Sequence, residues 1–469
     1  MINNKKYALL ALCLLLFSPI YSIDPNTVIA TVNTGVNPAG IGITPNNKFA
    51  YVANNNNYDI EGQDSVTVID LSTDLPVTTI MDDSFNAPFT VTINARGTMA
   101  YVTNSGSTTI SIIDTSTNEV VGVIGGFDGP SGMVIDQANN HAYVSNFGSA
   151  AGVGSGNGTT VRVVDLNTNM IVGSPITVGK GPQALAITPD EHFVYVANYV
   201  DGNAGTGTVS VISTSNNTVG NTITGFSGPF DIAITPNGRF AYVTNFGSNN
   251  FAPFGTTVSV INLHNNTIVD TIEVGIQPSG VAITPDSKFV YVTNFNTLYA
   301  GPDFTDLTAG QGTVSIISVS QQAVVPPTIA VDQSPANIAI TSNGAFALVS
   351  NYTSNTVSVI TLKPLFPQSF KVIGKACKIK EHDGHWANKL IWKAVGTFEA
   401  VNYSIYRDKK LTDLVAVVPA TQPFVKYIDR HPSKKQEVYY IVGTDNQGNV
   451  SQPGTLKVQG KCKDSNSRS

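Results

Sequence analysis

The sequence predicts an all-β chain in which a seven-bladed β-propeller is followed by a small β-sandwich. The first observation is a motif that occurs seven times: Pro-x-x-apolar-x-apolar, a short Asn/Asp/Gly turn and a strand close to Tyr-Val-Thr-Asn. The second is its spacing, because intervals of 42 to 57 residues suit a blade of four strands. The third is composition: only 12% of the residues are charged, and Asn, Thr, Ser, Gly and Val dominate, which favours strands and turns. The seven copies begin at Pro38, Pro88, Pro130, Pro182, Pro229, Pro278 and Pro335.

Four short strands can be assigned to each copy, and the copy that begins at Pro278 is the clearest. The segment Asn266–Gly275 precedes this proline, GVAIT and FVYVTN follow it, and TVSIIS begins at Thr313. Thr, Val, Ile and Tyr alternate with small residues there, as half-buried strands require. The second strand ends in Asn in every copy, and we expect this Asn to hydrogen-bond to the backbone locally. These residues are Asn54, Asn104, Asn146, Asn198, Asn245, Asn294 and Asn351.

The order of the strands also predicts how the ring closes. The first copy takes the segment Val28–Gly35 as the strand before its proline, whereas no further strand follows Val357–Leu362 in the last copy. We therefore expect the N-terminal strand to complete the last blade, which removes the exposed edges that an open array would have.

The N-terminal residues 1–22 have the features of a secretory signal peptide. Lys5 and Lys6 provide the positive start, Ala8–Phe17 the apolar centre and Ser22 a small residue for cleavage. We expect the mature chain to be secreted, periplasmic or on the cell surface, and to have no transmembrane segment.

Charge is divided unevenly along the chain. Residues 27–362 hold 6 basic and 22 acidic residues, whereas residues 363–469 hold 18 basic and 9 acidic residues. An acidic propeller is not expected to bind nucleic acid. The basic C-terminal part could contact acidic surfaces or dock against its own acidic neighbour. It also contains the two cysteines that remain after signal cleavage, Cys377 and Cys462, for which an oxidising compartment favours one disulfide.

The repeats resemble the YVTN-family β-propellers, which are known from archaeal surface-layer proteins and many exported bacterial proteins. The resemblance is carried by AYVTN at Ala241–Asn245, VYVTN at Val290–Asn294 and the TPN and TPD turns, and it covers roughly residues 26–362. It implies the propeller fold but no particular activity, because propellers include enzymes, sensors and scaffolds.

After Pro364 and Pro367 the composition changes, and alternating segments indicate a small sandwich. Its pattern is similar to fibronectin type III domains, in which Trp392 would be the buried tryptophan of the second strand and Tyr439 the corner tyrosine. The sequence therefore divides into a signal peptide at 1–22, the propeller at 23–362, a linker at 363–367, the fibronectin type III-like domain at 368–462 and a polar tail at 463–469.

One face of the propeller is the expected binding face, because all long insertions fall between the second and third strands of the blades. Aromatic residues in these connections suit a sugar, a peptide or an apolar ligand. The alternative is that they pin the connections onto the blades. They are Tyr58, Phe147, Tyr199, Phe246, Phe251, Phe254, Phe295, Tyr299, Phe304 and Tyr352.

Signals for metal binding or catalysis are weak. Ca²⁺ could bind the acidic residues of two connections, although neither spacing matches an EF-hand loop and a solvated acidic loop is the alternative. These residues are Asp59, Glu61, Asp64, Asp303 and Asp306. No other cofactor and no catalytic residue is indicated. The propeller histidines fall in short turns on the opposite face, and no His follows the prolines, where lactonase-like and streptogramin-lyase-like propellers would carry one at the channel mouth.

The function expected from these observations is that of an exported, non-enzymatic binding or scaffold protein of the bacterial envelope or secreted fraction. Its loop face would recognise a protein or a glycan, as in adhesion. One alternative is a metal-assisted enzyme of the lactonase or lyase type at the channel mouth, using Asp59, Asp64, Asp231 or Asp303. A second alternative is a structural surface-layer subunit.

Overall fold

The computed structural model describes residues 25–461, apart from internal gaps. The gaps are 57–63, 137–140, 149–155, 200–206, 248–253, 301–305, 363–370, 381–384, 396–401, 409–412, 420–424, 433–437 and 445–453. The chain forms two compact units, one of which is Asn26–Leu362, while the other contains Lys363–Ser469. None of the described segments is a helix long and apolar enough to cross a membrane.

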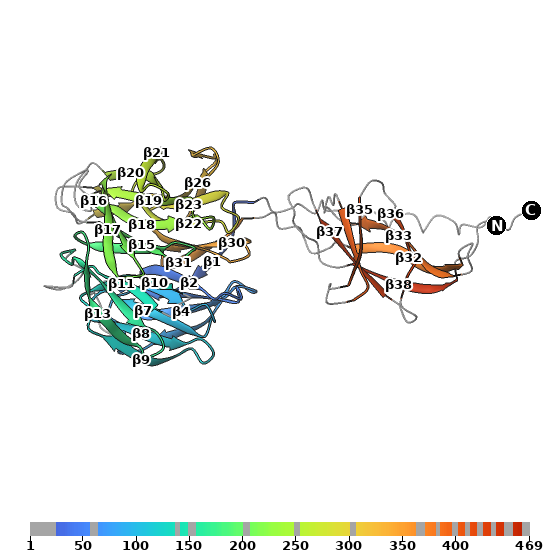
Figure 1. Ribbon diagram of the computed structural model, residues 1–469, viewed down its shortest axis with the longest axis horizontal. Coiled ribbons are helices and arrows are strands. Elements are labelled where there is room, and N and C mark those ends of the chain that lie inside the picture. Colours follow the sequence, from blue (N-terminus) through green and yellow to red (C-terminus); the bar gives the residue numbers. More distant parts are fainter. Residues whose placement is uncertain are drawn as a thin grey trace, which may run out of the picture. The chain divides into compact units, whose positions relative to one another are not determined.

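The unit Asn26–Leu362 is a ring of seven antiparallel sheets, or blades, which Figure 1 shows in sequence colours. Blade 1 consists of β2 (Pro38–Ile43), β3 (Phe49–Asn54), β4 (Ser65–Asp70) and β5 (Leu75–Met81). Blade 2 consists of β6 (Pro88–Ile93), β7 (Met99–Asn104), β8 (Thr109–Asp114) and β9 (Glu119–Gly125). Blade 3 consists of β10 (Pro130–Asp136), β11 (His141–Asn146), β12 (Thr160–Asp165) and β13 (Met170–Thr177). Blade 4 consists of β14 (Pro182–Ile187), β15 (Phe193–Asn198), β16 (Gly207–Ser213) and β17 (Thr218–Phe226).

Blades 5 to 7 complete the ring. Blade 5 consists of β18 (Pro229–Ile234), β19 (Phe240–Gly247), β20 (Phe254–Asn262) and β21 (Thr267–Glu273). Blade 6 consists of β22 (Pro278–Ile283), β23 (Phe289–Asn294), β26 (Gly312–Ser318) and an outer strand in two pieces, β27 (Ala323–Val324) and β28 (Ile329–Val331). Blade 7 consists of β29 (Pro335–Ile340), β30 (Phe346–Asn351), β31 (Thr356–Thr361) and β1 (Thr27–Asn33). The predicted seven-bladed propeller is therefore confirmed.

Ring closure by the N-terminal strand is also confirmed. β1 pairs antiparallel with β31, from Thr27 opposite Thr361 to Asn33 opposite Thr356, and the two strands lie side by side in Figure 1. Two side chains strengthen this junction. The Tyr291 hydroxyl of blade 6 donates to Asn26 Oδ1 at 2.6 Å, just before β1. The Ser350 hydroxyl of blade 7 donates to the Ala39 carbonyl of blade 1 at 2.6 Å.

The Asn that ends each second strand holds its own blade together. Asn245 Nδ2 donates to Thr257 Oγ1 and to Ser259 Oγ, both at 2.9 Å, and the same arrangement recurs in five other blades. In blade 3, where Arg162 replaces the second hydroxyl, Asn146 Nδ2 donates to Thr160 Oγ1 at 2.9 Å. The predicted local hydrogen bonds exist, but the main partners are hydroxyls of the third strand rather than backbone groups. Backbone bonds are added in some blades, as from Gly275 N to Asn294 Oδ1 at 3.0 Å.

The core of the propeller is divided among the seven contacts between neighbouring blades. Each contact has its own cluster of buried apolar side chains, including the one between blades 7 and 1, where Val32 of β1 packs with Ile41 and Leu348. A blade therefore buries its faces only against its two neighbours, as expected for a repeat protein.

Two features of the connections differ from the sequence prediction. The connection Phe295–Gly312 contains a short hairpin of β24 (Thr297–Ala300) and β25 (Asp306–Ala309). In blade 5, β19 runs on to Gly247, which pairs with Phe254 at the start of β20. Strand pairing thus extends into two segments that were expected to be loops.

The second unit consists of two joined sheets. One holds β32 (Lys371–Lys380), β33 (Trp386–Val395) and β36 (Val425–Asp429). The other holds β35 (Leu414–Pro419), β34 (Asn402–Tyr406), β37 (Val438–Thr444) and β38 (Gly454–Lys461). β38 also pairs in parallel with β32.

A cluster around Trp392 forms the core of this unit. The Trp392 and Tyr403 rings pack edge to face with centroids 5.8 Å apart. Cys377 is disulfide-bonded. Its predicted partner Cys462 lies outside the described residues, directly after Lys461, which is paired in register with Lys378.

Candidate functional site

The repeated proline places one end of every blade at the axis of the ring. The first strand of each blade is the inner edge of its sheet, and its proline pairs in register with the Asn that ends the second strand, as Pro278 does with Asn294. The residues that follow this proline and this Asn therefore meet at the same end of the blade. These residues surround the mouth of the central channel on the face that carries the long connections.

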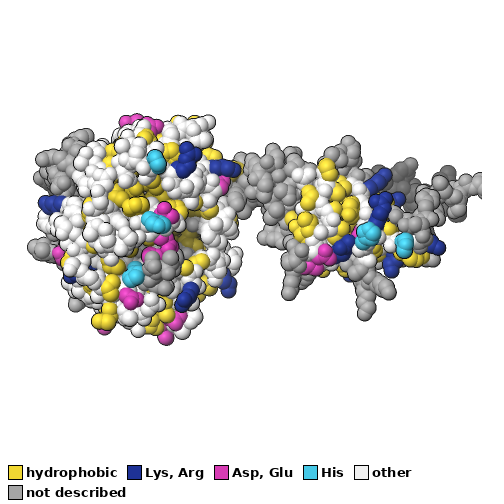
Figure 2. Space-filling view, in the orientation of Figure 1, with side chains coloured by type: hydrophobic (Ala, Val, Ile, Leu, Met, Phe, Trp, Pro, Cys, Tyr) yellow, Lys and Arg dark blue, Asp and Glu magenta, His cyan; other side chains and the backbone are white. Residues whose placement is uncertain are grey.

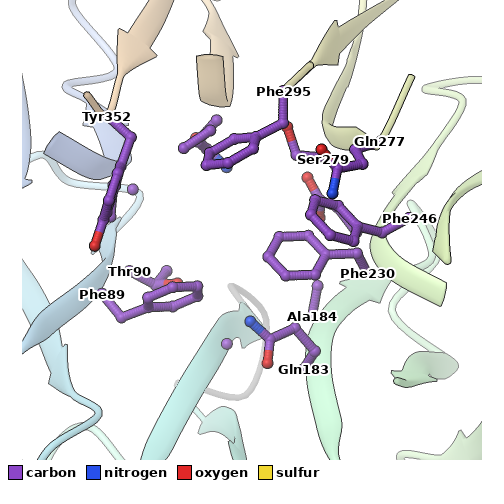
Figure 3. A pocket seen from close by; sticks show the side chains of 16 residues that line it. Phe89, Thr90, Gln183, Ala184, Phe230, Phe246, Gln277, Ser279, Phe295 and Tyr352 are labelled. Carbon is purple, nitrogen blue, oxygen red and sulfur yellow. The ribbon is translucent and has the colours of Figure 1, made fainter. Parts of the chain in front are cut away.

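A cavity of about 400 Å³ lies at this mouth. Residues one or two positions after the prolines of all seven blades line it, together with Phe246, Phe295 and Tyr352, which follow the repeated Asn. Figure 3 shows these aromatic side chains around the cavity. The predicted binding face therefore contains a described cavity, and three predicted aromatic residues form part of its wall.

The predicted aromatic residues form a continuous arc on blades 3 to 7. Ring centroids are 6.5 Å apart for Phe147 and Tyr199, and 6.4 Å apart for Tyr199 and Phe246. They are 6.1 Å apart for Phe246 and Phe295, and 6.2 Å apart for Phe295 and Tyr352. The arc stops at blades 1 and 2, where the residues after the repeated Asn are polar rather than aromatic.

Burial divides the arc into supporting and lining residues. Tyr199 is 9% exposed and lies behind the cavity wall, whereas Phe295 and Tyr352 are more exposed and line the cavity. Phe147 contacts Tyr199 but is not part of the wall. The two interpretations of the sequence, ligand contact and pinning of the connections, thus apply to different members of the same arc.

Phe89 and Phe230 are site residues that the sequence analysis missed. Each directly follows the proline of its blade and lines the cavity. Phe230 stacks on Phe246 with centroids 5.2 Å apart and meets Tyr199 edge to face at 5.8 Å. The signal was available, because a residue one or two positions after the proline lines the cavity in every copy, but the positions directly after the prolines had been compared only for histidine.

Other predicted site residues lie away from the cavity or cannot be placed. Phe254 begins β20 and is partly buried, but it does not line the cavity. Tyr299 and Asp306 lie on β24 and β25, where only the backbone is described. The remaining ones lie outside the described residues: Tyr58, Phe251, Phe304, Asp59, Glu61 and Asp303.

Asp64, a weak metal candidate, makes two backbone contacts. Its Oδ1 accepts a hydrogen bond from Asn56 N at 3.0 Å, and its Oδ2 accepts one from Ala87 N at 2.8 Å. The carboxylate thus links blade 1 to the segment before blade 2. Among the described residues, no group of three or more His, Cys, Asp or Glu is arranged to hold a metal ion.

Asp231 is the one acidic side chain among the described residues that line the cavity. Its Oδ1 accepts a hydrogen bond from Ile232 N at 2.8 Å, and its Oδ2 accepts one from Val281 N of blade 6 at 2.9 Å. Burial raises the pKa of Asp231 to about 6, although both hydrogen bonds act in the opposite direction. The carboxylate is held in a fixed position and is largely ionised at neutral pH.

The propeller histidines lie on the other face, as the sequence predicts. A second, polar cavity of about 420 Å³ is lined there by residues that include His141, His192, Asp136 and Asp190. Figure 2 shows His and acidic side chains near one another on the propeller. His192 and Asp190 lie 3.5 Å apart, and both side chains are well exposed. This face has no aromatic arc among the described residues that line its cavity.

No family model matches the chain. Two curated proteins of Mycobacterium tuberculosis are similar to parts of it. The PE-PGRS family protein PE_PGRS18 is 50% identical over 58 residues, which make up 12% of this chain and 12% of that protein. The "Seven-bladed beta-propeller protein Rv1057" is 28% identical over 127 residues, which make up 27% of this chain and 29% of that protein. The chain therefore matches less than a third of either relative's length.

Among solved structures, the hydrazine synthase of Kuenenia stuttgartiensis has a similar fold. The TM-score is 0.58 and the identity 19%, and the match covers 70% of this chain and 96% of that chain. At this identity the similarity concerns the fold alone. Together with Rv1057 and the seven sheets, it supports a seven-bladed β-propeller.

Proposed function

We propose that this chain is an exported binding protein whose ligand enters the mouth of the propeller channel. The observation that carries this proposal is the arc of aromatic rings beside a cavity of about 400 Å³ on the face with the long connections. Aromatic rings with a few fixed polar groups are the usual composition of a ligand site. The amides of Gln183 and Gln277 and the hydroxyl of Ser279 supply such groups here.

The partner would be a protein or a glycan that inserts a compact group into this mouth. A scaffold or adhesion-like role in the envelope or the secreted fraction agrees with the signal-like residues 1–22. Hydrogen bonds support the predicted YVTN-type repeat. Its Tyr and its Thr or Ser can donate to the next blade, and its Asn donates to the third strand of its own blade.

The C-terminal unit would act as a fibronectin type III-like spacer or docking module. This assignment is supported by its joined sheets of three and four strands, by the fully buried Trp392 in the second strand and by the buried Tyr439. The Tyr439 hydroxyl donates to Asp429 Oδ2 at 2.6 Å. The register of β32 with β38 supports the proposed Cys377–Cys462 disulfide.

Two phenylalanines at opposite ends of one strand allow a matched test. Phe295 directly follows β23 at the channel mouth, whereas Phe289 begins the same strand and is 37% exposed at the other end. Binding of the labelled mature chain to the organism's envelope fraction and to foreign cell surfaces should be saturable. Phe295→Ala should lower the affinity at least about tenfold, as for an interface hot spot, while Phe289→Ala should not change it. Equal binding by both variants would place the ligand elsewhere.

A metal-assisted enzyme at the same mouth is the second candidate, and it is favoured by one observation. Asp231 lies at the cavity with its pKa raised to about 6, a value that suits a carboxylate acting as a base near neutral pH. The discriminating measurement is the metal content of the purified chain, with screening of small esters and lactones. A stoichiometric ion that is lost in Asp231→Asn would favour the enzyme.

A further inference from the structure

We propose that the channel mouth recognises an alkylammonium group, that is, a positively charged nitrogen carried on methyl or methylene groups. This inference rests on the proposed function, because it names the chemistry of a ligand at the same cavity. It follows from the combination of ring faces, a single fixed carboxylate and the charge of the surrounding links.

Five aromatic rings from four different blades line the cavity. They are Phe89 of blade 2, Phe230 and Phe246 of blade 5, the Phe295 that follows β23 of blade 6 and Tyr352 after β30 of blade 7, and Figure 3 shows their rings around one space. The face of an aromatic ring carries partial negative charge and attracts a cation that has lost part of its water shell. Methyl and methylene groups around the nitrogen fit such a wall, because they add apolar contact without needing hydrogen bonds.

Asp231 supplies the counter-charge. It is the one ionisable acid on the wall, and no Lys, Arg or His belongs to the described residues that line the cavity. Backbone N–H groups of Ile232 and Val281 hold both carboxylate oxygens in place. A fixed carboxylate beside ring faces favours a cation and disfavours an anion.

The links that lead into the repeated prolines add to the negative charge around the mouth. They carry Asp82, Asp83, Asp128 and Asp332, against a single exposed Lys180. A neutral sugar would also stack on the rings, but it would gain nothing from this charge. The charge pattern therefore favours a cation over the glycan that the rings alone would also fit.

The decisive comparison uses choline and its neutral carbon isostere dimethylbutanol, in which a tert-butyl group replaces the trimethylammonium group. Calorimetric or NMR titration of the intact chain at pH 7.5 should show saturable binding of choline at the mouth. The isostere has the same shape without the charge. It should bind at least about fivefold more weakly, which is the lower end of the effect expected for one desolvated cation–π contact. Equal binding of the two compounds would overturn the inference, and so would the absence of choline binding.

Two variants and one control variant locate the effect. Phe295→Leu keeps an apolar wall but removes a ring face, so choline affinity should fall about five- to thirtyfold, while the affinity for dimethylbutanol should change little. Phe289→Leu at the other end of β23 should leave both affinities unchanged. Asp231→Asn keeps the shape of the side chain and one acceptor oxygen, and it should also lower choline affinity. Unchanged choline binding in a folded Phe295→Leu protein contradicts the proposal.

The pH dependence provides a measurement that does not rely on a variant. A cation favours the ionised carboxylate, so choline affinity should be highest above pH 7 and fall below pH 6, near the pKa of about 6 of the free group. The strands packed against β18 are β14, β15, β16, β19 and β22. They carry Tyr195 and Tyr242 as their titratable groups, and burial raises both pKa values to about 12. Only Asp231 can therefore account for a change between pH 5 and 8 within this set, and a flat profile would speak against its role.

A free small amine and the lysine side chain of a protein share this chemistry. Titration with Nα-acetyl-lysine methylamide, which has a free side-chain ammonium group, and with a lysine-containing peptide gives affinities to compare with that for choline. Tighter binding of the lysine compounds indicates a protein lysine as the source, and tighter binding of choline indicates a small amine. If Phe295→Ala abolishes envelope binding while choline and dimethylbutanol bind equally, the cation inference fails and the proposed function stands. If choline does not bind and Phe295→Ala leaves envelope binding intact, both fail.

Discussion

At the scale of single residues, the repeated tyrosine links neighbouring blades at five of the seven contacts between them. The Tyr143 hydroxyl of blade 3 donates at 2.7 Å to Asn217 Oδ1, in the turn before the last strand of blade 4. Asn217 has a positive φ of 55°, a backbone conformation that Asn tolerates better than most residues. The Tyr and the turn Asn are 74 positions apart, so this link cannot be recognised from one copy of the repeat.

Tyr143→Phe removes this hydroxyl and leaves the buried ring in place. We expect the free energy of unfolding to fall by about 1 kcal/mol, the net value of a typical hydrogen bond. Tyr101 is the matched control, because its hydroxyl makes no hydrogen bond to another described residue, so Tyr101→Phe should cost clearly less. Urea unfolding followed by circular dichroism compares the two variants, and equal losses would contradict the role of the link.

Asp231 should impose a pH dependence on stability. Its pKa is about 6 in the folded chain against an ordinary 3.8, so the folded state binds more protons between these values. The contribution of this group to stability is therefore greatest below pH 4, declines as the pH rises to 6 and is constant above. The difference in unfolding free energy between the native chain and Asp231→Asn should follow this course. A difference independent of pH would show that the carboxylate is not desolvated as described.

At the scale of elements, the ring depends on one strand from the distant N-terminal end. β1 covers the edge of β31, and Val32 enters the apolar cluster between blades 7 and 1. This closure could be predicted by counting strands in the sequence. The β24–β25 hairpin could not, because Thr297–Ala300 and Asp306–Ala309 have only four residues each, too few for a clear alternating pattern.

Deletion of residues 23–35 should sharply lower the melting temperature of the propeller. The deletion exposes the edge of β31 and opens the cluster that contains Val32. Differential scanning calorimetry of the deleted and the mature chain measures the effect. Deletion of the polar tail 463–469 serves as a control that should leave the propeller melt unchanged. A propeller that melts normally without residues 23–35 would reject closure by β1.

Sequence reasoning predicted the fold better than the site, and the reason lies in the repeat. Each Pro-to-Asn segment carries its own strands and turn, so the blades follow from local patterns. The cavity instead combines residues from all seven blades. Phe89 and Phe230 can therefore be recognised as site residues only when the fold brings them to the same cavity as Phe246. The sequence offered Asp231 only as one of four acidic residues for the enzymatic alternative, and its place at the cavity wall is evident only in the structure.

At the scale of the whole molecule, the two units can be followed separately. Both tryptophans of the chain, Trp386 and Trp392, belong to the second unit. Its buried network joins Arg407, Asp429 and Tyr439, with Arg407 donating to both Asp429 oxygens at 3.1 and 2.8 Å. Burial by itself raises the pKa of Asp429, but hydrogen bonds from Arg407, Tyr439 and the His431 N–H outweigh it and leave the pKa lowered.

Arg407→Met leaves the buried Asp429 carboxylate without its positively charged partner. We expect a loss of about 3 kcal/mol at pH 7 in the unfolding transition reported by tryptophan fluorescence. Because the pKa of Asp429 is lowered, its stabilising contribution is present above pH 4 and is lost as the pH falls through the folded value. The penalty of the variant should therefore shrink in acid, and the propeller transition should not move. A penalty that persists unchanged at low pH would contradict the ion-pair account.

Blocking the channel mouth tests whether ligands bind there, without knowledge of the ligand. Ala336 lines the cavity on β29, whereas Lys288 is exposed in the turn before β23 on the other face. A bulky maleimide attached to Ala336→Cys should abolish saturable binding to the envelope fraction, and the same label on Lys288→Cys should leave binding unchanged. Full binding by the chain labelled at Ala336→Cys would contradict the account.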